Sequence, residues 1–165
     1  MQKAVYLVLL VFTSMCWAQD SSFLALVKVD YSSTSGKEDT QFSLDKERHI
    51  FFIESDNKEE LLFYNAFLKE KEESHSAGTI KNVKRIKNTK EQQVYSFEWN
   101  VENSYDAIKS KVFVTLEINE SETTNKECKA KITITNEKDL QLVYKGIILY
   151  YVNPLLFYYR LEKII

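Results

Sequence analysis

Apolar and polar side chains alternate along much of the second half of this chain. Between residues 128 and 135, an apolar residue precedes each lysine or threonine, in the order Cys128, Ala130, Ile132 and Ile134. Successive side chains of a β-strand point to opposite faces, so this pattern predicts a strand with one buried and one solvated face. The same alternation predicts strands at 95–101 and 111–118. We therefore expect residues 92–152 to form antiparallel strands joined by short turns.

Other segments are apolar on both faces. Residues 140–152 fit a strand that is covered on its second side, and residues 49–54 contain the continuous apolar run Ile50, Phe51, Phe52 and Ile53. Residues 23–31 are expected to form the first strand, with shorter strands at 42–44 and 79–86. After 140–152, the pair Asn153-Pro154 predicts the end of one element and the start of another.

One helix is predicted, from residue 57 to about residue 71. Asp56 or Asn57 can cap its start, and a glutamate follows three residues later, as in a capping box. Its apolar face is broad and comprises Leu61, Leu62, Phe63, Tyr64, Ala66, Phe67 and Leu68. The expected fold is therefore α+β, an antiparallel meander sheet of about five to seven strands with this helix packed on one face. The alternative is an all-β sandwich or flattened barrel in which the helix plugs one end.

The first 18 residues have the features of a signal peptide. Lys3 supplies a positive start, residues 4–12 are apolar, and Cys16-Trp17-Ala18 matches a cleavage site with small residues. Cleavage before Gln19 would leave residues 19–165 as a single β-rich domain that is periplasmic, outer-envelope or secreted. The alternative, that Cys16 is retained and lipidated, is left open. The mature chain is expected to contain no transmembrane span.

Composition and charge exclude several functions. Hydrophobic residues make up 44% of the 165 residues, which argues against disorder. The formal net charge is −2, and removal of Lys3 makes it more negative, so nucleic-acid binding is not expected. Cleavage leaves Cys128 as the one cysteine, which excludes an intramolecular disulfide.

Catalytic and cofactor motifs are not found in the sequence. His49 and His75 have no cysteine or histidine at ligand spacing, and no nucleophile elbow or glycine-rich phosphate loop occurs. Glu98 and Glu102 alternate with apolar residues on a solvated strand face, where carboxylates seldom act as an acid and base pair. We therefore expect no enzyme activity, no metal and no cofactor.

The C-terminal segment suggests a binding role. Residues 146–159 are rich in apolar and aromatic residues, among them Tyr150, Tyr151, Tyr158 and Tyr159. An exposed aromatic surface of this kind would make the protein a non-catalytic interaction module for an envelope or extracellular protein. The alternative is a carrier of a small apolar ligand held between sheet and helix, with the candidate contacts Phe63, Phe67, Phe97, Trp99 and Tyr144.

The helix and the closing hairpin suggest a family. The segment 129–136 leading into 140–144 resembles the closing hairpin of small exported bacterial domains of unknown function with a TBP-like fold, the DUF4468 type. In that family a short helix is followed by long antiparallel strands, and the resemblance covers about residues 50–145. It implies an α+β fold and supplies no activity and no site residues.

Overall fold

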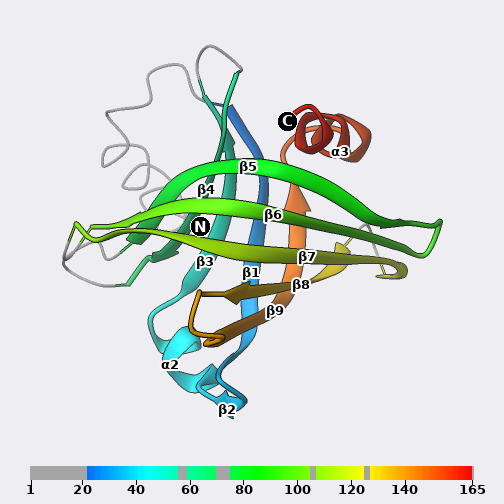
Figure 1. The fold of residues 1–165 in the computed structure, drawn as a ribbon. Coiled ribbons are helices and arrows are strands. Elements are labelled where there is room, and N and C mark those ends of the chain that lie inside the picture. The colour runs from blue at the N-terminus through cyan, green and yellow to red at the C-terminus, as the bar shows by residue number, and fades with distance from the viewer. Residues whose placement is uncertain (1–21, 56–58, 70–74, 105–106, 125–126, 165) are drawn as a thin grey trace, which may run out of the picture.

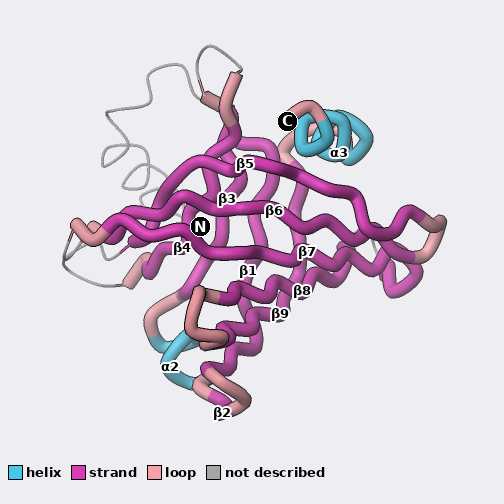
Figure 2. Tube along the Cα trace, viewed as in Figure 1, coloured by secondary structure: helices cyan, strands magenta, loops and turns pink. Residues whose placement is uncertain are grey.

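The computed structural model describes residues 22–55, 59–69, 75–104, 107–124 and 127–164. The predicted signal peptide, including Cys16, lies outside these residues. Within them, the elements follow in this order: β1 Ser22–Thr34, β2 Lys37–Glu38, α2 Thr40–Asp45, β3 Arg48–Glu54, β4 Leu61–Phe67, β5 His75–Asn88, β6 Gln92–Asn103, β7 Lys109–Thr124, β8 Glu127–Thr135, β9 Gln141–Tyr150 and α3 Pro154–Glu162. Strands make up most of the trace, and the two short helices lie at its margins (Figure 2).

Eight strands form a closed antiparallel barrel (Figure 1). Each strand pairs with the next in the order β1, β3, β4, β5, β6, β7, β8 and β9, and β9 returns to pair with β1 from Ala25↔Tyr150 to Thr34↔Leu142. The two-residue strand β2 adds only to the end of β1. The expected open α+β meander with a helix on one face is therefore wrong. The structure is closer to the all-β alternative.

The predicted helix at 57–71 is the source of this error. Its apolar centre, Leu61–Phe67, is strand β4, which pairs with β3 through Phe52↔Phe63 and with β5 through Phe63↔Gly78. A segment that is apolar on both sides fits either a buried helix or a strand covered on both faces, so periodicity alone does not separate them. Here β4 pairs with a strand on each side, β3 and β5, and its seven residues therefore form a strand.

Most of the other predicted strands are confirmed. Strands β6, β7, β8 and β9 contain or closely match the predicted strands at 95–101, 111–118, 128–135 and 140–152, and β1 and β3 match those at 23–31 and 49–54. The strand expected at 79–86 is present but begins earlier, at His75. The strand expected at 42–44 is wrong, because these residues lie in helix α2.

Large apolar side chains pack inside the barrel. Phe63 is fully buried, and its ring centroid lies 4.8 Å from that of Trp99, 5.8 Å from Phe97 and 5.1 Å from Phe52. The other inward-facing positions are mostly branched aliphatic residues of β1, β7, β8 and β9. This continuous core accounts for much of the hydrophobic stabilisation of the fold.

Two glycines allow strands to approach closely. A Cβ atom at Gly146 of β9 would lie 2.0 Å from the carbonyl oxygen of Lys28, and one at Gly78 of β5 would lie 1.7 Å from that of Asn100. Such contacts are far inside van der Waals distance. Glycine at position 146 therefore permits the pairing of β9 with β1 that closes the barrel.

Helix α3 closes one end of the barrel. The Asn153 side chain accepts a hydrogen bond from the Leu155 amide at 2.9 Å, and Pro154 occupies the first turn, so the helix begins directly after β9. Phe157, Tyr158 and Leu161 point inward and are buried. The prediction of a second element after Asn153-Pro154 is confirmed.

Candidate interaction surface

The outer side of four neighbouring strands is apolar. On β3, Phe51 points away from the core and pairs with Leu26 of β1 and Tyr64 of β4. One row further along, Ile53 pairs with Phe23 and Leu62 in the same way. Leu26 also pairs with Leu149 of β9. We call this set the apolar outer face; it comprises Phe23, Leu26, Phe51, Ile53, Leu62, Tyr64, Leu149 and the adjoining Tyr151.

Exposure within this face increases from its centre to its margin. Phe51 and Ile53 are only 7% and 4% exposed, whereas Leu149 and Tyr151 are 38% and 61% exposed. Leu26, Leu62 and Tyr64 are half-buried. Aromatic contacts connect the centre to the margin, because the Phe23 ring lies 6.0 Å from Phe51 and 6.1 Å from Tyr151.

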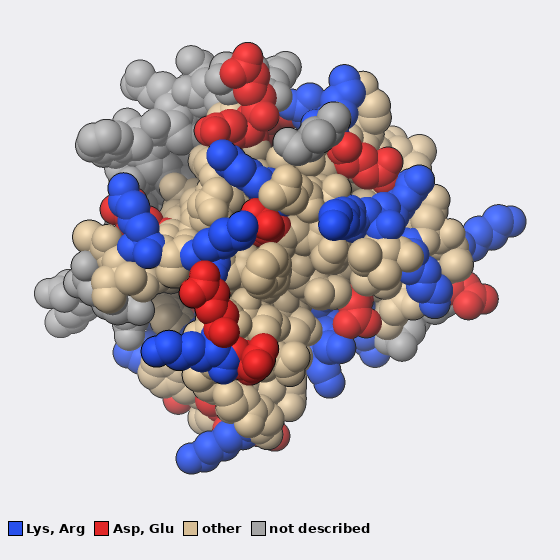
Figure 3. Space-filling view, viewed as in Figure 1, with Lys and Arg blue, Asp and Glu red and all other residues tan. Residues whose placement is uncertain are grey.

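The outer side of β6, β7 and β8 is different in character. Cross-strand ion pairs join Glu98 to Lys111 and Glu117 to Lys131 at 2.8 Å, and Glu102 to Lys109 at 3.3 Å. Figure 3 shows basic and acidic side chains interspersed over the strands that lie in front in Figure 1. The Lys111 ammonium, which donates a hydrogen bond to Glu98, lowers the pKa of that carboxyl. We call these six residues the charged outer face.

The four C-terminal tyrosines divide into two pairs. Tyr151 and Tyr159 are 61% and 51% exposed, whereas Tyr158 is buried and Tyr150 packs against the core. The Tyr150 and Tyr158 hydroxyls are 2.8 Å apart, and Tyr158 donates to Glu120 Oε1 at 2.8 Å. Burial raises the pKa of both buried phenols, so they stay neutral. Only Tyr151 and Tyr159 are therefore available to a partner.

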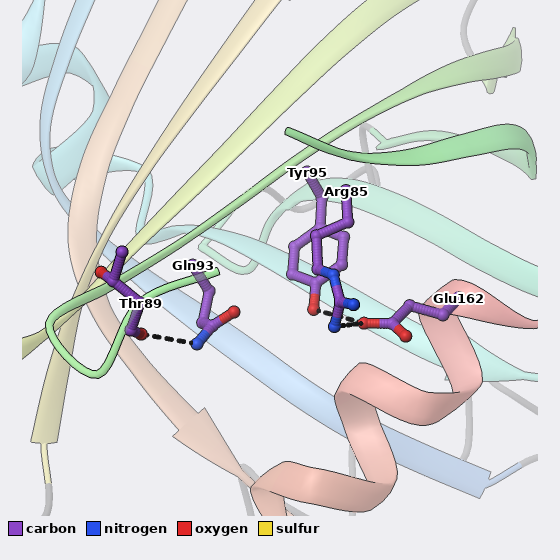
Figure 4. Close-up of polar contacts among 5 residues, drawn as sticks. All are labelled: Arg85, Thr89, Gln93, Tyr95 and Glu162. Carbon is purple, nitrogen blue, oxygen red and sulfur yellow. Dashed lines mark hydrogen bonds and ion pairs between the residues drawn. The ribbon is translucent and has the colours of Figure 1, made fainter. Parts of the chain in front are cut away.

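Polar contacts hold α3 on the barrel (Figure 4). Glu162 Oε1 accepts hydrogen bonds from the Tyr95 hydroxyl at 3.0 Å and from Arg85 Nη1 at 2.8 Å. Burial, and then the Glu162 carboxylate, raise the pKa of Tyr95. In Figure 4 the Gln93 side chain instead points to the β5–β6 turn, where its amide donates to the Thr89 carbonyl at 2.9 Å.

A hollow lies beside α3 where this helix meets the start of β4. It encloses about 310 Å³ and is lined by Glu54, Glu59, Glu60, Leu61, Arg160, Lys163 and Ile164. Its two most buried charges, Glu54 and Arg160, pair with each other. This ion pair connects β3 to α3.

The candidate ligand contacts do not form one site. Phe63, Phe97 and Trp99 pack against one another in the core, while Phe67 and Tyr144 lie beside Arg48. The Trp99 Nε1 group is buried and has no hydrogen-bond partner in the described part of the chain, which is unusual for an indole. The rings of Phe63, Phe97 and Trp99 therefore contact one another in the core.

The histidines and the cysteine occupy unrelated positions. His49 and His75 both pair with Ala66 on the outside of the barrel, and burial lowers the pKa of His49. Cys128 is half-buried and its pKa is raised by burial, which disfavours the reactive thiolate. Among the described residues, no group of three or more histidine, cysteine, aspartate or glutamate side chains is placed to hold a metal ion.

The sequence patterns did not lead us to predict the apolar outer face. Its signals are the runs Ile50 to Ile53 and Leu61 to Tyr64, in which both strand faces are apolar. The helix predicted for the second run would place its whole apolar surface against the sheet. As a strand, β4 instead presents Leu62 and Tyr64 outward.

Comparisons with known protein families, curated proteins and solved structures find no match to this chain. The resemblance to the exported domains with a TBP-like fold therefore stays a prediction. Neither α2 nor α3, the helices of the described part of the chain, has the length and hydrophobicity needed to cross a lipid bilayer.

Proposed function

We propose that this protein is a non-catalytic interaction module of the cell envelope or extracellular space, and that it binds a partner protein through the apolar outer face. The observation that carries the proposal is the pair of apolar rows across β9, β1, β3 and β4, in which Phe51 and Ile53 are already buried and the accessible residues are Leu26, Leu62, Tyr64, Leu149 and the adjoining Tyr151. A closed barrel buries its inward side chains and needs no apolar residues outside. Contiguous apolar surface on the outside is typical of a protein interface.

The composition of this face favours a protein partner. Aromatic residues are enriched in protein interfaces, and Tyr64, Tyr151 and Phe23 are aromatic. Toward α2, the exposed Lys28 pairs with His49 and Ile147, and the exposed Lys145 pairs with Tyr31 further along, so charges lie at the margin and are missing from the centre. An apolar centre with a polar rim matches the usual anatomy of an interface. We expect the partner to present an apolar patch of its own.

The carrier hypothesis is less well supported. It assigned Phe63, Phe97 and Trp99 to ligand contacts, and these rings pack against each other. A ligand between them would have to displace core side chains, at a cost of several kcal/mol. We therefore retain the interaction module as the proposed function.

The test is a pull-down of the tagged mature protein from solubilised envelope and culture medium of its source. The face variant combines Tyr64→Lys, Leu149→Lys and Tyr151→Ser. The matched control combines Phe113→Lys and Ile86→Lys, which alter side chains 51% and 63% exposed on β7 and β5. We expect the same partner with the wild type and the control, and its loss with the face variant.

Two further arms identify what binds the face. Sedimentation of the purified protein tests for a second copy, and flotation with anionic lipid vesicles tests for a bilayer. The double variant Leu155→Ser and Tyr159→Ser alters only the exposed side of α3 and should still capture the partner. Capture that depends on α3 and survives the face variant would contradict the proposal. Self-association or vesicle binding without a partner would do so too.

A further inference from the structure

Arg48 lies at the end of the barrel opposite α3. Strand β3 begins at Arg48, just after α2, and ends at Glu54, which pairs with Arg160 of α3. At about 3.3 Å per residue, this strand separates the two ends by roughly 20 Å. Figure 1 shows α2 and α3 at opposite ends of the molecule. Any site at Arg48 is thus distinct from the C-terminal tyrosines and from the hollow beside α3.

Two aromatic rings fix the Arg48 guanidinium group. Its Cζ atom lies 4.3 Å from the centroid of Phe67, the cross-strand neighbour on β4, and 4.8 Å from that of Tyr144 on β9. Nη1 also donates a hydrogen bond to the Tyr144 hydroxyl. The group is therefore held in one orientation before any ligand arrives.

The charge of Arg48 is not neutralised by a carboxylate of the described residues. Its Nε atom is buried and has no hydrogen-bond acceptor among the residues that the structure describes. Asp39, whose charge acts on Tyr144, accepts hydrogen bonds from the Ser32 and Thr34 hydroxyls, the latter at 2.8 Å. Burial raises the pKa of Tyr144, so its phenol is neutral and supplies no counter-charge. A partly buried guanidinium group in this state favours an anion.

Apolar surface lies next to this charge. Phe42 of α2 is 50% exposed, and its ring centroid lies 5.5 Å from that of Phe67. Phe67 thus contacts both the Arg48 guanidinium group and the exposed ring of Phe42. A ligand that joins an anionic group to a short apolar tail would match both features.

We propose that Arg48 binds the carboxylate of a small amphiphilic acid, with the acid's apolar tail on Phe42 and Phe67. Because Nη1 is bonded to Tyr144 and Nε is buried, Nη2 is the nitrogen left for the ligand. Its N–H groups can donate charge-assisted hydrogen bonds to a carboxylate. The proposal is independent of the partner-binding face.

The test is an NMR titration of the mature protein with hexanoate, in which the Arg48 Nε–H signal is followed directly. We expect a saturable shift of this signal. Hexan-1-ol has the same tail without the charge, and should bind at least about tenfold more weakly. Arg48→Gln should weaken hexanoate binding about tenfold or more, and Arg48→Lys should fall between, because lysine keeps the charge and loses the planar group that Phe67 and Tyr144 hold in place.

The matched control is Lys87→Gln, which removes one positive charge from an exposed position on β5 whose ammonium donates to Gln92. It should bind hexanoate as the wild type does, and so should the face variant Tyr64→Lys, Leu149→Lys and Tyr151→Ser. If Arg48→Gln fails to fold, the comparison of hexanoate with hexan-1-ol on the wild type decides. Equal binding of the two compounds, or an Arg48 signal that hexanoate leaves unchanged, would overturn the proposal.

Discussion

The two outer faces of this barrel differ because the strands that form them carry different sequence patterns. On β6, β7 and β8, apolar side chains point inward and ion-paired glutamates and lysines point outward. On β1, β3, β4 and β9, both sides are apolar, and Phe51 and Ile53 are nearly as buried as the core although they point away from it. The charged outer face needs only solvent outside. The apolar outer face is expected to have another surface against it.

The largest expected effect comes from comparing an inward-facing with an outward-facing residue of β4. Phe63→Ala removes a fully buried ring from the core and should lower the free energy of unfolding by about 3–5 kcal/mol. Tyr64→Ser, one residue later on the outer side, should cost less than about 1 kcal/mol. Urea unfolding of the two variants measures the difference. Equal costs would mean that β4 does not alternate between the core and the outer face.

The helix predicted for residues 57–71 shows which kind of segment could not be assigned from the sequence. Strands β6 to β8 could be predicted because polar or charged residues at most alternate positions fix both the period and the solvated side. In Leu61 to Phe67 no charge marks a side, so a helix with a broad apolar face explained the residues equally well. Closure of the barrel could not be predicted either, since it depends on pairing between β1 and β9, which lie far apart in the sequence.

The candidate site was only partly predicted. The aromatic C-terminus was recognised, but period alone did not show that Tyr150 faces the core and Tyr151 faces out, or that α3 buries Tyr158 and exposes Tyr159. Arg48 was not singled out, because nothing in its sequence neighbours marks it. Its aromatic neighbours Phe67 and Tyr144 come from other strands.

A smaller effect separates the buried tyrosines from the exposed ones. Tyr158→Phe removes a hydroxyl that donates to Glu120 and contacts the Tyr150 hydroxyl, and should cost about 1–2 kcal/mol of stability. Tyr159→Phe alters an exposed ring and should change stability by less than about 0.5 kcal/mol. Thermal unfolding of both variants tests this. A large loss for Tyr159→Phe would mean that this ring contributes to the fold.

The smallest effect concerns the charged outer face and depends on pH. The pKa of Glu98 lies below its ordinary value of 4.5, chiefly because Lys111 donates a hydrogen bond to it. A carboxyl with a lowered pKa stabilises the fold above its unfolded pKa, and this contribution is lost as pH falls through the folded pKa. Lys111→Met should raise the pKa of Glu98 and reduce the acid-dependent loss of stability. Side-chain carboxyl NMR gives the pKa, and an unchanged value in the variant would exclude Lys111 as its cause.

The central claim is that the apolar outer face binds a partner protein, and site-specific photo-crosslinking tests it most directly. A photoreactive side chain is placed at position 64, on that face, or at position 113, on the outer side of β7, and the protein is irradiated in the cells that produce it. The account predicts one discrete adduct from position 64 that is absent from position 113. Adducts that are equal at the two positions, or none at position 64, would contradict it.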